Sequence, residues 1–472
     1  MTPIDEAQAR PSKRWWDVAG WSQLLKSFSM AMSPAKLGLA LAALAFSLVW
    51  GVVLDWIWVK AGAGVEQQAT VVRPVIQEED GEAEAQVARA GVFETWWELE
   101  RTAMLGCASA VRHGNLLGSF AAEPPDPRLR LLNSLAPDAG PDIFGRTMGL
   151  MGCVGQMVSG VTWLVREHWF YAILFLGGSL IVWAWLGGAI CRMHAVQYAV
   201  DIRVSPTAAL AYSQERLFGG FVAAPLMPLI FVLIIGLVLV IGGLVLSIPW
   251  LGDILGGLLF GFAILAGGVI AFTLLAALLS SFLFWPAIAA DSYDGPAAVL
   301  HTVSYVQTRL GRALWYLLLT VVLASITWIV VNWLVWFAMA CAGVFVEIGA
   351  LPGERLQTVW GLGGPSAFFT AARPEGARDT VLWTLIGAWM ALFVGLIWAY
   401  MVSFWLGCGT IAYFLLRSSV DNISFAEVSL TNEERDLLEQ TGELEAAPPE
   451  EAENPQAVGD KMIENPGAGD AT

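Results

Sequence analysis

Ionisable side chains inside long apolar segments are the residues of this chain best placed to do chemistry. A charged group within a bilayer is costly and is usually retained for a function. Asp55 is the clearest such residue, and it lies five positions before Lys60 near the end of an apolar segment. This spacing predicts an interfacial ion pair rather than a proton relay. Asn332 is a second polar residue within an apolar run, and we expect its amide to hydrogen-bond a neighbouring helix.

Histidine and cysteine, the usual metal ligands and nucleophiles, are sparse and scattered. The four histidines show no paired spacing, and the chain contains no HExxH, Gly-x-Ser-x-Gly or P-loop sequence. We therefore expect no catalytic residue, no metal and no cofactor, and we expect that the protein is not an enzyme. Among five cysteines, only Cys107 and Cys153 share a long loop, so they are candidates for a disulfide or are unpaired small residues of a core.

Small residues and prolines carry the clearer information. Gly257 and Gly261 form a GxxxG pattern, and Gly187 and Gly188 place two residues without side chains in an earlier apolar run. Such positions let helices approach closely in lipid, so they predict a compact bundle or a dimer. Pro225 and Pro228 stand near the start of another apolar run and predict a kink. Together with Asn332, these two prolines mark a candidate cavity.

The elements that position these residues are membrane-spanning helices. The chain has 472 residues, of which 57% are hydrophobic and 14% are charged, and its mean hydropathy is +0.62. A helix needs about 20 apolar residues to cross a bilayer. Six stretches are long enough: 37–59, 169–190, 221–248, 256–285, 313–345 and 382–415. The expected fold is an all-α polytopic bundle of about six transmembrane helices.

A phrase that occurs three times, after the second, fourth and sixth apolar stretches, refines this architecture. Its copies begin at Asp201, Asp291 and Asp421, and each reaches a leucine nine residues later. In the first two copies a small residue and proline stand where a helix would begin. These copies predict elbow helices, which we define as surface helices preceding a span, over 206–217 and 296–310, with a similar one over 15–28. The chain is thus expected to form three hairpins.

The remaining boundaries follow from composition and charge. We expect an N-terminus with an amphipathic helix over 1–36, a first span over 37–59, a helical extracytoplasmic segment over 60–168, the bundle over 169–415, and an acidic, largely disordered tail over 416–472. Within the extracytoplasmic segment, 147–165 is read as an interfacial or re-entrant helix, with a seventh span as the alternative. The sequence from Thr431 to Glu434 fits a capping box.

The distribution of Lys and Arg predicts the orientation. Basic residues cluster before the first span and after the second, fourth and sixth spans. This pattern places both termini in the cytoplasm. The expected location is the bacterial inner membrane. No nucleic acid is expected among the partners of a chain whose net charge is −16.

Several segments together resemble a group of uncharacterised bacterial multi-pass inner-membrane proteins. They are the surface helix before Lys36, the exit 187–192, the turn 248–255 and the stretch 285–289 that leads to 304–306. The elbow helices are also loosely similar to those of the membrane domain attached to some glycerophosphodiester phosphodiesterases, although this chain lacks a phosphodiesterase domain. The resemblance implies an architecture and brings no catalytic residues.

The function favoured by these observations is non-enzymatic: a scaffold for a membrane complex or a protein that organises the membrane. The alternative is a transporter or lipid-handling protein that uses the cavity at Pro225 and Pro228. The expected partners are membrane lipids and either a membrane protein complex or further copies of the chain.

Overall fold

The computed structural model describes residues 21–62, 64–66, 89–112, 150–246, 248, 250–349, 377–425 and 427–440. By its contacts the chain divides into two units, Met1–Val428 and Ser429–Thr472. The first unit contains all of the long apolar helices. The acidic tail beyond residue 440 lies outside the described residues.

Six helices are long and apolar enough to cross a membrane, as the sequence predicts. A multi-pass, all-helical membrane fold follows from their length and hydropathy. In chain order they are α4 (Pro34–Lys60), α8 (Trp169–Val200), α10 (Ala223–Leu246) with the preceding π-helical turn η1 (Leu217–Val222), α11 (Leu251–Asp291), α13 (Leu310–Gly349) and α16 (Ala377–Val420).

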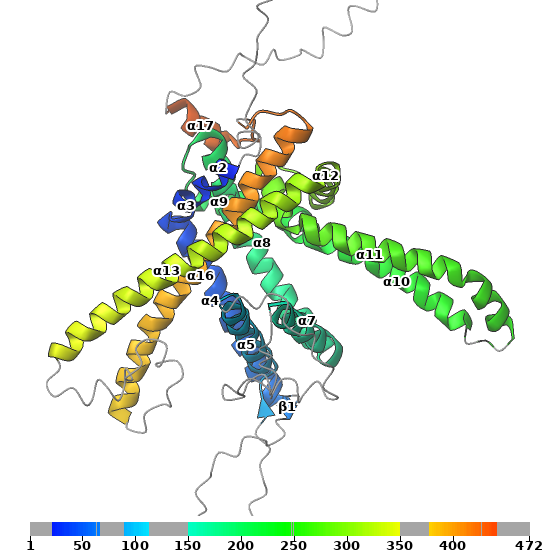
Figure 1. Ribbon diagram of the computed structural model, residues 1–472, viewed down its shortest axis with the longest axis horizontal. Coiled ribbons are helices and arrows are strands. Elements are labelled where there is room, and N and C mark those ends of the chain that lie inside the picture. Colours follow the sequence, from blue (N-terminus) through cyan, green and yellow to red (C-terminus); the bar gives the residue numbers. More distant parts are fainter. Residues whose placement is uncertain are drawn as a thin grey trace, which may run out of the picture. The chain divides into compact units, whose positions relative to one another are not determined.

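These helices pair as three hairpins, α4 with α8, α10 with α11 and α13 with α16 (Figure 1). The second helices of the hairpins, α8, α11 and α16, also pack against one another. Their C-terminal parts are buried on all sides over 187–196, 286–290 and 407–417. The core of the bundle therefore lies where these three helices end.

The end of the α10–α11 hairpin that is distant from this core makes few contacts with other elements of the described chain. Between residues 229 and 279, Gly252 is the one buried residue among those whose burial is described. No other part of the described chain lies within 4 Å of a Cβ built on Gly257 or on Gly261. The prediction that these two glycines hold the bundle together is therefore wrong within one chain, because no helix of the described chain approaches them. A contact between two copies through Gly257 and Gly261 stays a prediction.

The elbow helices are present before the first, third and fifth spans. They are α2 (Trp21–Leu24) with α3 (Lys26–Ala31), α9 (Pro206–Glu215) and α12 (Gly295–Thr308). Left-handed backbone at Asp201 (φ 54°) and Ser292 (φ 59°) ends the preceding helices, and the Ser205 hydroxyl caps α9 by accepting from the Ala208 N–H at 3.2 Å. Helix α12 packs partly on the protein core, since Val299 and Val306 are buried.

The third copy of the repeated phrase does not start an elbow helix. The chain turns with Asn422 in the left-handed region (φ 57°), but residues 423–425 and 427–431 are non-helical. This copy lacks the small residue and proline that preset a first helical turn. The next helix is α17 (Asn432–Gln440) in the second unit, where Thr431 and Glu434 form the predicted capping box.

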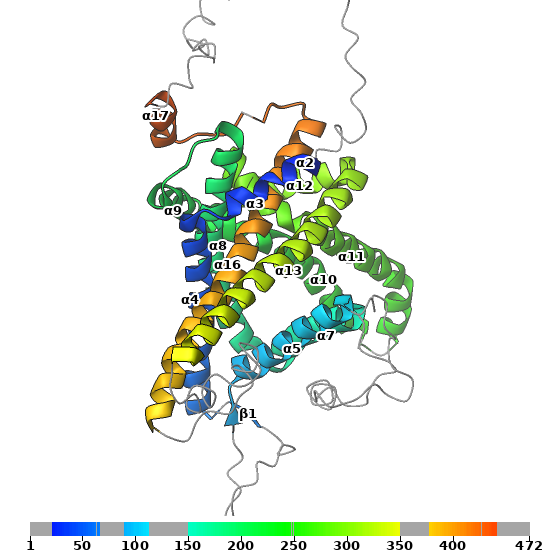
Figure 2. The ribbon, with the colours of Figure 1, turned by 60° about the vertical axis from the view of Figure 1, so that its left-hand side comes forward.

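The segment between α4 and α8 contributes a separate pair of helices, α5 (Val92–Arg112) and α7 (Leu150–Glu167), which lie side by side (Figures 1 and 2). A short antiparallel pairing of β1 (Val65–Glu66) with β2 (Arg89–Ala90) precedes them. Helix α7 is not among the six helices with the length and hydropathy of a span. We call this pair the α5–α7 layer; its interfacial or re-entrant position stays a prediction.

Candidate functional site

The core end of the bundle contains a group of ionisable side chains, four buried and one, Asp291, half-buried, which we call the polar layer. Its members come from α4, α8, α11 and α16: Lys36, Arg192, His194, Asp291 and Arg417.

Lys36 is 1% exposed and binds three acceptors, one on α3 and two on α8. Its Nζ donates to the Met30 carbonyl at 3.1 Å and to Gln197 Oε1 at 2.6 Å, and it lies 3.1 Å from His194 Nδ1. An ammonium has three N–H donors, so these three acceptors satisfy it completely. The lysine thereby ties the elbow formed by α3 to α4 and α8.

The network continues from His194 into α16. With Nδ1 accepting from Lys36, the neutral tautomer carries its proton on Nε2, which lies 3.3 Å from the Ser403 hydroxyl. Ser403 in turn donates to the Ala31 carbonyl at 3.3 Å. A Cβ on Gly407 would lie 3.0 Å from His194 Cε1, so the imidazole packs directly on the backbone of α16.

Arg417 forms the second part of the polar layer and is 2% exposed. Its guanidinium binds the Asp291 carboxylate and also donates to the carbonyls of Ser424 and Glu427. The Tyr413 hydroxyl donates to the other oxygen of Asp291. Arg417 therefore fixes the end of α11 and the turn after α16 to each other.

The elbow α12 joins this cluster through Tyr305, whose hydroxyl donates to the Asp421 carboxylate. Burial raises the pKa of Tyr305, and the neighbouring Asp421 raises it further. The phenol therefore stays protonated and remains a donor. Two carboxylates of the repeated phrase, Asp291 and Asp421, thus each bind a tyrosine.

Arg192 is the third buried cation, and its Nη1 donates to the Ala289 carbonyl at 2.6 Å. Its guanidinium carbon lies 4.2 Å from the centre of the Tyr212 ring, and that of Arg216 lies 4.5 Å from the same ring. Tyr212 donates to the Ile288 carbonyl at 2.7 Å, which anchors α9 on α11.

Gly187 and Gly188 allow the close packing around this layer. A Cβ on Gly187 would lie 2.9 Å from the Trp285 ring, and one on Gly188 would lie 2.5 Å from the Ser213 hydroxyl and 3.0 Å from the Phe221 ring. These glycines therefore stand where helices approach each other closely, as predicted for small residues in lipid.

Asp55 lies at the other end of α4 and has a different partner from the one its spacing predicts. Its carboxylate accepts from the main-chain N–H groups of Phe93 at 2.8 Å and Glu94 at 2.9 Å, and from the Tyr171 hydroxyl at 2.7 Å. The prediction of an ion pair with Lys60 is wrong, because the unsatisfied N–H groups at the start of α5 bind the carboxylate instead. The Lys60 ammonium lies 3.8 Å from the centre of the Trp56 ring.

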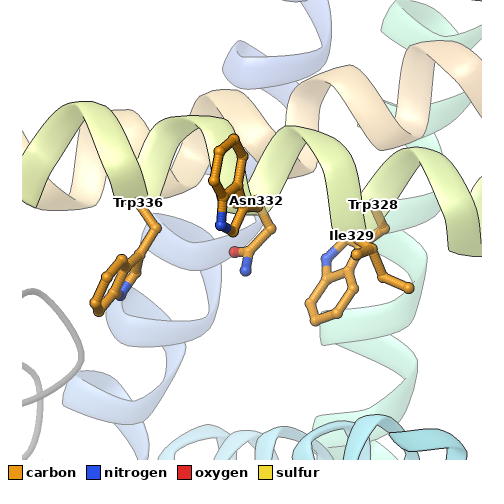
Figure 3. Close-up of a pocket in the computed structure, with 5 residues that line it drawn as sticks. Trp328, Ile329, Asn332 and Trp336 are labelled. Carbon is orange, nitrogen blue, oxygen red and sulfur yellow. The ribbon is translucent and has the colours of Figure 1, made fainter.

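The predicted cavity residues do not come together. Asn332 borders a shallow hollow lined by Trp328, Ile329, Trp333 and Trp336, all on α13 (Figure 3). Pro228 is buried within α10 and Pro225 is half-buried. Neither proline lines this hollow, so the three residues do not mark one cavity there.

The structure places one of the two cysteines of the predicted disulfide. Cys153 is buried on α7, and its sulfur lies 2.9 Å from a Cβ built on Gly106 of α5. The side chain of Cys107 lies outside the described residues, so the disulfide stays a prediction. Among the described residues no group of three His, Cys, Asp or Glu side chains could hold a metal ion.

Sequence reasoning did not identify the polar layer. It took Lys36, Arg192 and Arg417 only as orientation signals at span ends, and it noted Asp291 only as part of a repeat. The available signal was the recurrence of a charged residue within the last turns of the second helix of each hairpin. Comparison with family models, with curated proteins and with solved structures finds no significant match.

Proposed function

We propose that this integral membrane protein is a non-enzymatic scaffold that holds membrane proteins together. The observation that supports this proposal most is that the side chains of the polar layer bind one another and the main chain, with only Arg417 Nε unpaired among the buried nitrogen and oxygen atoms of this layer. Lys36 has three acceptors, and Arg417 binds a carboxylate and two carbonyls. Groups that bind one another and the main chain stabilise a fold and leave little capacity to bind a substrate.

The exposed faces of the hairpins supply the surfaces that a scaffold needs. Leu258 on α11 is 76% exposed and Trp333 on α13 is 63% exposed, and both belong to long apolar faces. Lipid covers such faces in the absence of a partner, and small or aromatic residues on them favour contact with another helix. The proposal therefore assigns partner binding to the α10–α11 and α13–α16 hairpins.

We further propose the bacterial inner membrane as the location, with both termini in the cytoplasm. The basic residues near the polar layer support this orientation, because Lys and Arg are retained on the cytoplasmic side. This orientation would place the α5–α7 layer on the extracytoplasmic side of the membrane.

A two-stage crosslinking experiment tests the scaffold. A photoreactive amino acid at Leu258 or at Trp333 should give protein adducts of defined mass in living cells, while one at the buried Phe404 should give none. Deleting the gene should then separate two captured partners that copurify in the wild type. Adducts with lipid alone, or partners that still copurify after the deletion, would refute the proposal.

Conservative variants separate the scaffold from an enzyme or a transporter. Ser403→Ala and Tyr305→Phe each remove one hydroxyl from the network while keeping the size of the side chain. A scaffold should keep its partners and its cellular phenotype in both variants. Loss of the phenotype with the partner association intact would favour an enzyme or a transporter.

A further inference from the structure

The α5–α7 layer contains a buried carboxyl group at the contact between its two helices. Glu100 on α5 is 4% exposed. A Cβ built on Gly160 of α7 would lie 2.7 Å from Glu100 Oε1 and 2.9 Å from Leu99 Cδ2. The carboxyl group therefore packs against the backbone of α7 at a glycine, and a larger residue at position 160 would collide with it.

This carboxyl group is poorly compensated. Glu100 Oε1 has no hydrogen-bond partner among the described residues. An ionised carboxylate with one oxygen unpaired is expensive to bury, whereas a neutral carboxylic acid costs less. Ionisation must therefore weaken the contact between α5 and α7.

We propose that Glu100 is a proton-operated latch: when it is protonated the two helices stay packed, and when it is ionised the α5–α7 layer loosens. The latch goes beyond the proposed scaffold, because it assigns a regulatory response to the layer on the side of the membrane opposite the polar layer. Loosening would change what this layer presents to a partner or to the membrane surface.

The pKa of Glu100 lies close to neutral pH. Burial raises the pKa of Glu100 from 4.5 to about 7, and the nearby Trp96 indole opposes part of that shift. Because the folded pKa lies above the unfolded pKa, this stabilisation is complete below pH 4.5 and is lost as the pH rises through about 7. The layer is therefore expected to be closed in mild acid and looser in mild base.

The effect of Glu100 must be distinguished from the effects of other charged groups on the helices that pack against it. The titratable or charged residues on α7 are Cys153, Arg166 and Glu167. Helix α4 contributes Asp55 and Lys60 near the layer. Helix α5 itself carries Glu94 and the exposed ion pair Glu98–Arg101, in which Glu98 Oε1 and Arg101 Nη2 lie 2.6 Å apart. His168 precedes α8, and burial lowers its pKa below the usual value. Since His168 is a second titratable group with a shifted pKa, the test must vary Glu100 alone.

Hydrogen exchange measured by mass spectrometry on the full-length protein in lipid nanodiscs tests the latch. After correction for the intrinsic rate, amides of α5 and α7 in the wild type should exchange about tenfold faster at pH 8 than at pH 5.5. Glu100→Gln mimics the neutral acid, so exchange should be slow at both pH values. Glu98→Gln, which alters an exposed carboxylate two residues away, should keep the wild-type response.

Three results for the wild type and for Glu100→Gln would overturn the proposal, and a fourth concerns His168. The first three are a wild type without pH dependence in the layer, a Glu100→Gln variant that retains the full response, and a Glu100→Gln variant that exchanges fast at both pH values. His168→Gln should leave the response in place, and its disappearance there would assign the titration to the histidine instead.

Discussion

Asp55 is the residue at which one substitution should detach one part of the fold and leave the rest intact. Its carboxylate accepts two main-chain N–H groups at the start of α5 and the Tyr171 hydroxyl. Replacing a capping residue by alanine costs roughly 0.5–2 kcal/mol. The buried tyrosine hydroxyl keeps a weaker acceptor in the Gly51 carbonyl at 3.3 Å, so its loss adds about 1 kcal/mol.

Asp55→Ala should therefore destabilise the packing of α5 by about 1.5–3 kcal/mol. That free energy corresponds to an open population larger by roughly 10- to 150-fold. Hydrogen exchange in nanodiscs should report this increase in α5, while amides of α10 and α11 keep their wild-type rates. Asp55→Asn keeps one acceptor oxygen and should give a smaller increase.

Lys60→Gln is the matched control, because the sequence alone predicts an ion pair between Lys60 and Asp55. The structure places the Lys60 ammonium on the Trp56 ring, so this variant should leave exchange in α5 unchanged. Unchanged exchange in Asp55→Ala, or equal increases in Asp55→Ala and Lys60→Gln, would refute the capping role of Asp55.

Three further predictions concern packing, charge and topology. Gly188→Leu should prevent the bundle from folding, because even a Cβ there meets two side chains. Gly257→Leu should not lower the thermal midpoint of unfolding in detergent. Loss of a dimer in Gly257→Leu with an unchanged midpoint would show a contact between copies. Arg417→Met removes one partner of a buried ion pair and should cost about 3–5 kcal/mol in thermal unfolding, and a normal midpoint would contradict the structural role. In a background without other cysteines, Asp80→Cys should react with an impermeant reagent in intact cells and Gln440→Cys should not, and the opposite pattern would invert the proposed orientation.

The sequence by itself determined the membrane class, the six spans and the starts of the elbow helices. Hydrocarbon thickness sets the length of an apolar run, and a small residue followed by proline presets a first helical turn. Pro206 and Pro296 carry that signal, and the structure begins α9 and α12 at Pro206 and Gly295. The capping box at Thr431 and Glu434 was equally readable, because both partners lie within one turn.

Only the tertiary structure decided which polar groups meet. Asp55 accepts from Phe93, which is 38 residues away, and Lys36 meets His194, which is 158 residues away. Spacing along one helix cannot reveal such partners, because a different helix, distant in the sequence, supplies each of them. For the same reason the sequence does not distinguish the surroundings of Gly188 from those of Gly257. Gly188 lies against a neighbouring helix, whereas no other helix of the described chain meets Gly257. Local sequence sets the length of a helix and where it begins, but the packing of distant segments decides which of its faces are buried.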